Sequence, residues 1–311
     1  MSGSRLFHWR WPKEFQTLIR DGQPHFLCAP LPKFKVPQSP AGSPEVQEQI
    51  REKVVEVRKR GYIETGEVKS LTHMFEVAKG ISIRMVYDGT SSGLNDALWA
   101  PHFSLPTAET TLRGLVKGSH QSDLDVGEMF LNFMLHPDLR PYCGIDITFT
   151  QSTKPEDAEW EAGREKSWER WYRDMMGLAD SPYRSVQAFM WAKEWIMGDG
   201  KERVVPGTGS SKPGKGGKPI PMKDMQTENP FWWVDVVLNL PGDPDYDPSL
   251  PWVFKRRGDG TIAGDIFSYI DDVRPTGSTE EIWWQCTRMF GSRCNYLGIQ
   301  DAARQRRVPD L

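Results

Sequence analysis

Apolar residues recur at helical spacing in several stretches of the chain. The clearest stretch starts at Ser43 and Pro44, a typical cap residue followed by the residue that best suits the first turn. It stops at Gly61, a typical C-terminal cap. Ser181 and Pro182 repeat the start signal. The pattern therefore predicts helices over residues 44–60, 110–117, 153–174, 181–197 and 280–290.

Alternating apolar and polar residues predict strands in much of the remaining chain. A Lys-Gly turn separates residues 73–78 from 81–88, which is the pattern of a β-hairpin. Further strands are predicted over residues 122–126, 142–148, 231–238, 252–254 and 267–277. Residues 1–43 show little periodicity, and residues 198–230 are rich in Gly, Pro, Lys and Ser, as disordered insertions are. Together the elements predict an α+β fold.

Two groups of carboxylates stand at the ends of predicted strands. In residues 267–272, alternating bulky side chains lead into Asp271 and Asp272, which places the acids at the tip of a hairpin. Asp125 ends another strand. If the two strands are neighbours in one sheet, the three carboxylates converge and repel one another unless they hold cations. Mg²⁺ suits such a group, because it binds few carboxylates and completes its shell with waters and phosphates. Ordinary turn-forming acids are the alternative.

Composition limits the class of protein. The formal net charge of −3 leaves any nucleic-acid binding to a local basic face. The four cysteines form no Cys-x-x-Cys pair, which speaks against a zinc knuckle and favours a reduced, intracellular setting in cytoplasm or nucleus. No apolar run is long enough to span a bilayer and no signal-peptide pattern begins the chain, so no membrane partner is expected.

Four short motifs follow one another along the chain. Residues 84–88 read Arg-Met-Val-Tyr-Asp, with Leu-Asn at 94–95, and residues 124–130 read Leu-Asp-Val-Gly-Glu-Met-Phe. Residues 176–183 read Met-Gly-Leu-Ala-Asp-Ser-Pro-Tyr, and residues 269–272 read Tyr-Ile-Asp-Asp. In this order the motifs resemble the fingers strand, first palm motif, middle motif and catalytic hairpin of reverse transcriptases, the RNA-directed DNA polymerases of retroviruses and retrotransposons.

The resemblance implies a polymerase right hand. Residues 1–43 would form an irregular arm, residues 44–120 a fingers-like region, and residues 121–311 a palm whose antiparallel sheet carries helices on one face. Residues 198–230 would be an insertion where the family has a short connection, which is tolerable because a longer flexible loop costs little entropy. The chain ends soon after the Asp-Asp hairpin, near where the family's thumb follows, so no thumb is expected.

The resemblance also assigns roles to the acids. Asp125 and Asp271 would be the main ligands of two Mg²⁺ ions, which Mn²⁺ could replace, and the carbonyl of Val126 would be a further ligand. Asp272 would support the site's negative charge. Asp123 points the same way as Asp125, but its register misses the motif, so a structural role is expected for it.

Other motif residues would contact the nucleotide and the primer–template. Arg84 would hold the triphosphate through charge-assisted bonds, and Lys79 is either a second such contact or an exposed turn residue. Phe130 would crowd the 2′ side of the sugar and so select deoxynucleotides, or it would be a core aromatic. Gly177 would let the backbone approach closely beneath the nucleotide. The platform for template and primer would be formed by Ser181, Pro182 and Tyr269.

The function that follows from the resemblance is that of a reverse transcriptase domain of a retrotransposon-like element. Its partners would be an RNA or DNA template with a primer, dNTPs, and other segments of a retroelement polyprotein. The alternative is an inactive or truncated relic that at most binds nucleic acid, because no thumb or ribonuclease H pattern follows the hairpin. A third hypothesis is an unrelated α+β protein whose Asp-Asp hairpin is only a turn.

Overall fold

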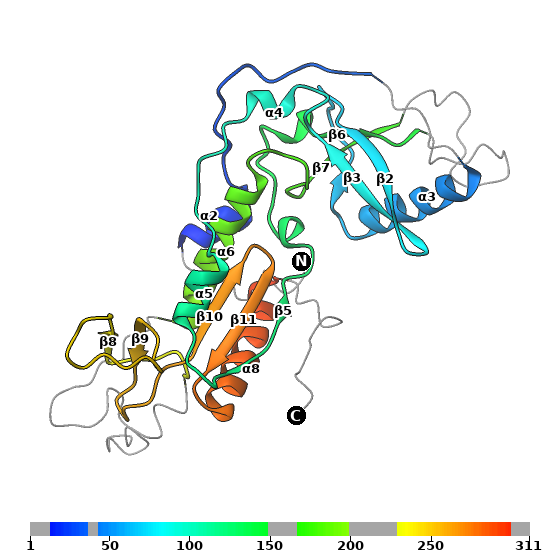
Figure 1. Cartoon of the computed structure of the whole chain (residues 1–311). Coiled ribbons are helices and arrows are strands. Elements are labelled where there is room, and N and C mark those ends of the chain that lie inside the picture. The colour runs from blue at the N-terminus through cyan, green and yellow to red at the C-terminus, as the bar shows by residue number, and fades with distance from the viewer. Residues whose placement is uncertain (1–12, 37–42, 149–166, 199–228, 300–311) are drawn as a thin grey trace, which may run out of the picture. The chain divides into compact units, whose positions relative to one another are not determined.

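The computed structural model describes residues 13–36, 43–148, 167–198 and 229–299 (Figure 1). The contacts within the chain divide it into two units. The described part of unit 1 comprises residues 104–129, 189–198 and 229–299. The described part of unit 2 comprises residues 13–36, 43–103, 130–148 and 167–188. The units cut across the regions predicted over residues 44–120 and 121–311, which stay predictions, and nearly all of the predicted insertion lies outside the described residues.

Unit 2 combines helices with two antiparallel sheets. Its helices are α2 (Lys13–Asp21), α3 (Pro44–Lys59), α4 (Leu94–Ala97) and the first half of α6 (Ser181–Met197), with a 3₁₀ turn η3 (Arg140–Tyr142). Its strands are β1 (Ile63–Glu64), β2 (His73–Lys79), β3 (Ser82–Asp88), β6 (Gly144–Asp146) and β7 (Trp168–Trp171). Strand β7 lies between β1 and β6, and β2 and β3 form the predicted hairpin.

The core of unit 2 forms where α3 packs against β3 and β1. The Ser43 hydroxyl caps α3 by accepting a hydrogen bond from the backbone N–H of Val46, as predicted. Ile50 and Val54, one turn apart on the buried side of α3, enter a core that also contains Trp171 of β7. Complete burial of such side chains contributes about 1.5–3 kcal/mol each, which fixes the helix on the sheets.

Two predictions of local structure are wrong in unit 2. Residues 13–21 form helix α2 inside the segment expected to be an irregular arm. Residues 168–171 form strand β7, whereas a surface helix was expected over residues 153–174. Glu169 and Trp171 are buried while Trp168 and Arg170 are half-buried, which is the alternation of a strand with neighbours on both edges. The rest of that expected helix, over residues 149–166, lies outside the described residues.

Unit 1 is built around an antiparallel sheet. Strands β10 (Asp265–Tyr269) and β11 (Asp272–Gly277) form the predicted hairpin, and β11 also pairs with β4 (His120–Gln121) and β5 (Leu124–Asp125). Helix α8 (Glu280–Leu297) packs against β11 (Figure 1). The remaining elements are α5 (Ala108–Gly114), the second half of α6, and a separate hairpin of β8 (Asp235–Leu238) with β9 (Val253–Arg256). The 3₁₀ turn η2 (Met129–Asn132) spans the boundary between the units.

The two faces of the β10–β11 hairpin differ in burial. Leu124, Ile266 and Val273 are almost completely buried on the face that α8 covers. Side chains alternate along strands, so the opposite face carries Tyr269 with Asp272, its cross-strand partner. The sheet of unit 1 therefore has an apolar face that packs against a helix and an acidic face that is left open.

None of the helices within the described ranges is long and apolar enough to cross a membrane.

Gly264, just before β10, shows how closely α8 approaches the sheet. A Cβ at Gly264 would lie 2.1 Å from the Sγ of Cys286 on α8. Gly264→Ala is expected to lower the free energy of unfolding by about 1–3 kcal/mol, as overpacking does. Cys286→Ala removes the sulfur, so the double variant should lose clearly less stability than the two single variants added together. Denaturant unfolding of the three variants measures this coupling, and strictly additive losses would contradict the packing.

Candidate active site

Two strands that are far apart in the sequence bring the predicted acids together in unit 1. Asp125 at the end of β5 lies directly opposite Asp272 at the start of β11. The backbone N–H of Val126 donates a hydrogen bond of 2.8 Å to the carbonyl of Asp271. Directly opposed residues have Cβ atoms about 4.5–5.5 Å apart. The condition that the sequence left open, that the strand of Asp125 and the hairpin are neighbours in one sheet, is therefore met.

The turns beside these acids are strained. Among the described residues, Ile270 and Glu128 are the two non-glycine residues with positive φ, at 53° and 52°. Ile270 is the first residue of the two-residue turn between β10 and β11, where a positive φ matches a type II′ turn. A β-branched residue in this conformation is rare and costs about 1–3 kcal/mol. The pairing of β5 with β11, together with the hydrogen bond from Val126 to Asp271, keeps Ile270 in this conformation.

A cavity of about 1020 Å³ opens over the acidic face of the hairpin. Strands β10 and β11 contribute Phe267, Tyr269 and Asp272 to its lining, and Asp125 contributes from β5. Residues 106–112, which include part of α5, supply the remaining wall. Asp271 sits in the turn and does not line this cavity. A space of this size accommodates a ligand as large as a nucleotide.

The charges in the cavity are unevenly balanced. Asp123 forms an ion pair of 2.7 Å with Arg274, which agrees with the structural role expected for this acid. Burial raises the pKa of the Asp272 carboxyl, and the carboxylates of Asp271 and Asp123 raise it further, while Arg274 lowers it. The negative charges around Asp272 therefore outweigh the one guanidinium, and a bound cation would relieve their repulsion.

The oxygen donors here suit a hard cation such as Mg²⁺. In the residues that the structure describes, however, no three Asp, Glu, His or Cys side chains lie close enough together to hold a metal ion. The backbone places Asp125 opposite Asp272, while the exposed side chains of Asp271 and Asp272 do not complete a group of three ligands with it. Rotation of these two exposed side chains is the movement that would bring their oxygens onto a shared ion.

The predicted triphosphate contacts lie on unit 2. Arg84 is opposite Val77 in the β2–β3 hairpin, and Lys79 is two residues further along β2, so both basic side chains share one exposed face. The Arg84 guanidinium makes no ion pair with any residue of the described ranges. The same face carries His73 and Phe75, whose rings stack with centroids 5.8 Å apart. Sequence reasoning missed this aromatic pair, although its period-2 alternation with the buried Met74 could have revealed it.

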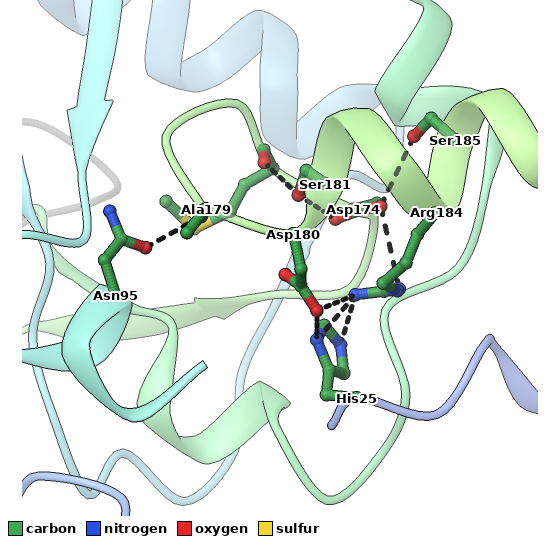
Figure 2. Close-up of polar contacts among 9 residues, drawn as sticks. His25, Asn95, Asp174, Ala179, Asp180, Ser181, Arg184 and Ser185 are labelled. Atoms are coloured by element: carbon green, nitrogen blue, oxygen red, sulfur yellow. Dashed lines mark hydrogen bonds and ion pairs between the residues drawn. The ribbon is translucent and has the colours of Figure 1, made fainter. Parts of the chain in front are cut away.

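Gly177 does permit a close backbone approach, and the structure identifies its partner. Gly177 has a φ of +100°, and a Cβ on it would lie 1.8 Å from the carbonyl oxygen of Tyr87. The side-chain amide of Asn95 clamps the same loop, since it donates to the Gly177 carbonyl and accepts from the Ala179 N–H, both at 2.9 Å. Figure 2 shows Asn95 reaching the loop from α4. Sequence reasoning quoted Asn95 within a motif but gave it no role.

The remaining predicted residues occupy different environments. The Ser181 side chain is completely buried and donates to Asp174 at 2.6 Å (Figure 2). The first hydrogen bond of α6 runs from the Arg184 N–H to the Asp180 carbonyl. The prediction that Ser181 caps α6 is therefore wrong, and Ser181 supports the loop from below. Pro182 and Phe130 are half-buried, in α6 and η2, and the Tyr269 side chain is 52 % exposed in the cavity.

Comparison of the chain with protein-family models and with curated proteins finds no match.

Gly177→Ala is expected to destabilise unit 2 much more than Gly80→Ala. Both glycines have positive φ, which costs alanine about 1–2 kcal/mol. A Cβ on Gly80 meets nothing within 4 Å, whereas a Cβ on Gly177 overlaps backbone and adds about 1–3 kcal/mol. Urea unfolding of both variants measures the difference. Equal losses of stability would contradict the close approach of residues 87 and 177.

Proposed function

We propose that this chain is the fingers–palm part of a reverse transcriptase, which adds dNTPs to a primer 3′-hydroxyl under the direction of a template. The observation that carries the proposal is the pairing of Asp125 with the Asp271–Asp272 hairpin. The two motifs that the resemblance assigns to one catalytic centre lie far apart in the sequence, yet they are adjacent in one ladder. The alternative, an unrelated fold with turn-forming acids, does not require these two segments to be adjacent.

The acids of unit 1 would bind the catalytic cations. Asp125 and Asp271 would hold Mg²⁺ with help from the Val126 carbonyl, and Asp272 would maintain the negative potential that attracts it. Bound Mg²⁺ would neutralise the charge that develops on the phosphates during the reaction. The strained turn at Ile270 supports this role, because the hydrogen bond from the Val126 N–H to the Asp271 carbonyl ties the turn to the segment that carries Asp125.

The reaction needs positioning more than covalent chemistry from the protein. The primer 3′-oxygen forms a bond to the α-phosphorus of the dNTP while the bond from that phosphorus to the bridging oxygen breaks. Pyrophosphate leaves, and the proton of the 3′-hydroxyl passes to solvent. No enzyme-linked intermediate is required, so the rate depends on holding the hydroxyl and the phosphate in line.

Unit 2 would supply the contacts to the nucleotide. Arg84 and Lys79 offer positive charge to a triphosphate on an exposed face, and neither forms an ion pair with any residue in the described part of the chain. The stacked His73 and Phe75 on that face offer an apolar surface for a base, since aromatic rings bind bases by stacking. The loop that contains Gly177 would approach the nucleotide through its backbone, and Phe130 would be the group that excludes a 2′-hydroxyl.

A second function is favoured by one observation. Because no three acidic side chains of the described residues converge on a metal-binding point, the chain could retain the surfaces of a polymerase without its reaction. It would then be a nucleic-acid-binding module. Binding would depend on Arg84 and Lys79 and would be insensitive to neutralisation of Asp125.

Primer extension on an RNA template with Mg²⁺ tests the first proposal. Asp125→Asn and Asp271→Asn are each expected to lower the rate by about 10²–10³-fold, because each removes charge that stabilises the transition state. Asp123→Asn is the matched control, as this acid lies two residues from Asp125 and is already paired with Arg274. Its rate should fall by less than about tenfold, since an exposed ion pair contributes little.

The same assay separates the two proposed functions. Extension that is equally strong in Asp271→Asn and in the unaltered chain would overturn the polymerase proposal. Retention of a labelled primer–template without any extension, weakened by Arg84→Gln but not by Asp125→Asn, would support the binding module instead. Neither extension nor binding by the unaltered chain would contradict both.

A further inference from the structure

A cluster of charged side chains is buried beneath the loop that contains Gly177. The Nδ1 of His25 lies 2.7 Å from the Oδ2 of Asp180, and the Nη2 of Arg184 lies 3.6 Å from the Oδ2 of Asp174 (Figure 2). All four side chains are at most 4 % exposed. Burying charged groups costs several kcal/mol for each ion before pairing is counted, so such a cluster is a poor way to gain stability alone.

His25 occupies the centre of the cluster. The Nη1 of Arg184 contacts both ring nitrogens of His25, and Nδ1 also lies 2.7 Å from the Oδ2 of Asp180. With the proton on Nδ1, that nitrogen donates to Asp180 and Nε2 is left as the acceptor toward Arg184. Burial lowers the pKa of His25 and Arg184 lowers it further, while Asp180 and Asp174 raise it. A neutral imidazole protonated on Nδ1 is therefore the form that bridges Asp180 and Arg184.

The bridge lies at the ends of the loop that the proposed function needs. Asp174 and Asp180 bracket residues 175–179, and Ser181 joins the two ends by donating to Asp174 and to the Met175 carbonyl at 3.0 Å. Asn95 holds the middle of the loop from the opposite side. The loop has an uncharged clamp on one side and the His25 bridge on the other.

His25 reaches the cluster from a segment remote in sequence that is itself docked on unit 2. Gln23 forms a parallel bridge with Leu135, and a Cβ on Gly22 would lie 2.8 Å from the His136 backbone nitrogen. This close docking leaves His25 little freedom to withdraw. When its protonation changes, Asp180 at the end of the loop and Arg184 on α6 must therefore move instead.

We propose that His25 is a positioning residue that fixes residues 175–179 while it is neutral and releases them when it is protonated. The consequence for polymerisation rests on the proposed function, whereas the effect on the loop does not. On protonation the Nε2 gains a hydrogen that faces the Arg184 guanidinium, so an accepted hydrogen bond is replaced by the repulsion of two cations.

The charged and titratable groups that face His25 set the direction of the pH effect. They are Asp180 and Asp174 from the loop ends, Arg184 from α6, and beyond them the buried thiol of Cys143, whose pKa is raised mainly by burial. Because the pKa of folded His25 lies below its unfolded value of about 6.5, its stabilisation is complete above that pH and is lost as the pH falls through the folded pKa. Burial raises the pKa of Asp174, so its contribution has the opposite sign and is lost as pH rises.

Hydrogen exchange read by mass spectrometry on the full chain tests the proposal. Peptides covering residues 175–183 are compared at about pH 7.5 and about pH 5.5, after correction for the intrinsic exchange rate at each pH. Because an open-state pKa of about 6.5 limits the effect of protonation at pH 5.5, protection in the unaltered chain should fall at the lower pH by up to about tenfold. His25→Gln, whose amide can donate to Asp180 and accept from Arg184 without titrating, should keep its protection at both values.

His25→Leu removes the bridge and should expose residues 175–183 at both pH values, while peptides from α3 keep their protection. Should this variant fail to fold, the unaltered chain and His25→Gln still decide the matter. Equal pH dependence in those two proteins, or none in either, would overturn the proposal. Because exchange is measured without substrate, a chain that does not extend primers leaves this test intact. In a chain that does extend primers, the KM for dNTP should rise at low pH as the loop is released. His25→Gln should abolish that rise.

Discussion

The hydrogen-bonded ladder between β5 and β11 is the constraint on which the candidate active site depends. Its register is set by the face that carries no acids. Leu124 and Val273 are cross-strand partners and are almost completely buried, so a slip of one residue would turn these apolar side chains toward the open cavity. The cost of exposing them keeps Asp125 opposite Asp272. Apolar burial on one side of the sheet thus determines the position of charge on the other.

The strain near the acids follows from the same ladder. Ile270 and Glu128 adopt positive φ in the turns that follow β10 and β5, the two strands that each pair with β11 at this end of the sheet. Neither turn would keep this conformation in isolation, because an ordinary residue there is less stable by about 1–3 kcal/mol. The stabilisation comes from β11, which itself packs against α8.

In unit 2, polar groups rather than a strand ladder hold a loop in place. The loop around Gly177 has no regular structure of its own, and the Asn95 amide hydrogen-bonds to one of its carbonyls, that of Gly177, and to one of its N–H groups, that of Ala179. Its ends are tied to a buried set of charges in which every member depends on the others. Such a set gives specificity to the loop conformation at a cost in free energy, and removing one member would leave another charge buried without its partner.

The local pattern of apolar and polar residues was sufficient to predict those elements whose buried side follows from their own residues. The helical spacing of Ile50 and Val54, the alternation in β10 and the turn residues after β2 correctly predicted α3 and both hairpins. The same patterns placed Asp125 and Asp271 at strand ends. The motif order added the expectation that the strands are adjacent, which the sheet confirms.

Other features depend on partners that the local sequence does not contain. Strand β7 is a strand because β1 and β6 flank it, although its charged surroundings suggested a helix. Ser181 does not cap α6 because its hydroxyl donates to Asp174 instead. His25 can be buried because it forms hydrogen bonds with Asp180 and Arg184. The sequence by itself determined where acids, glycines and apolar faces stand along the chain. Only the tertiary structure decided which of them meet, because hydrogen bonds and burial between distant segments outweigh local preference.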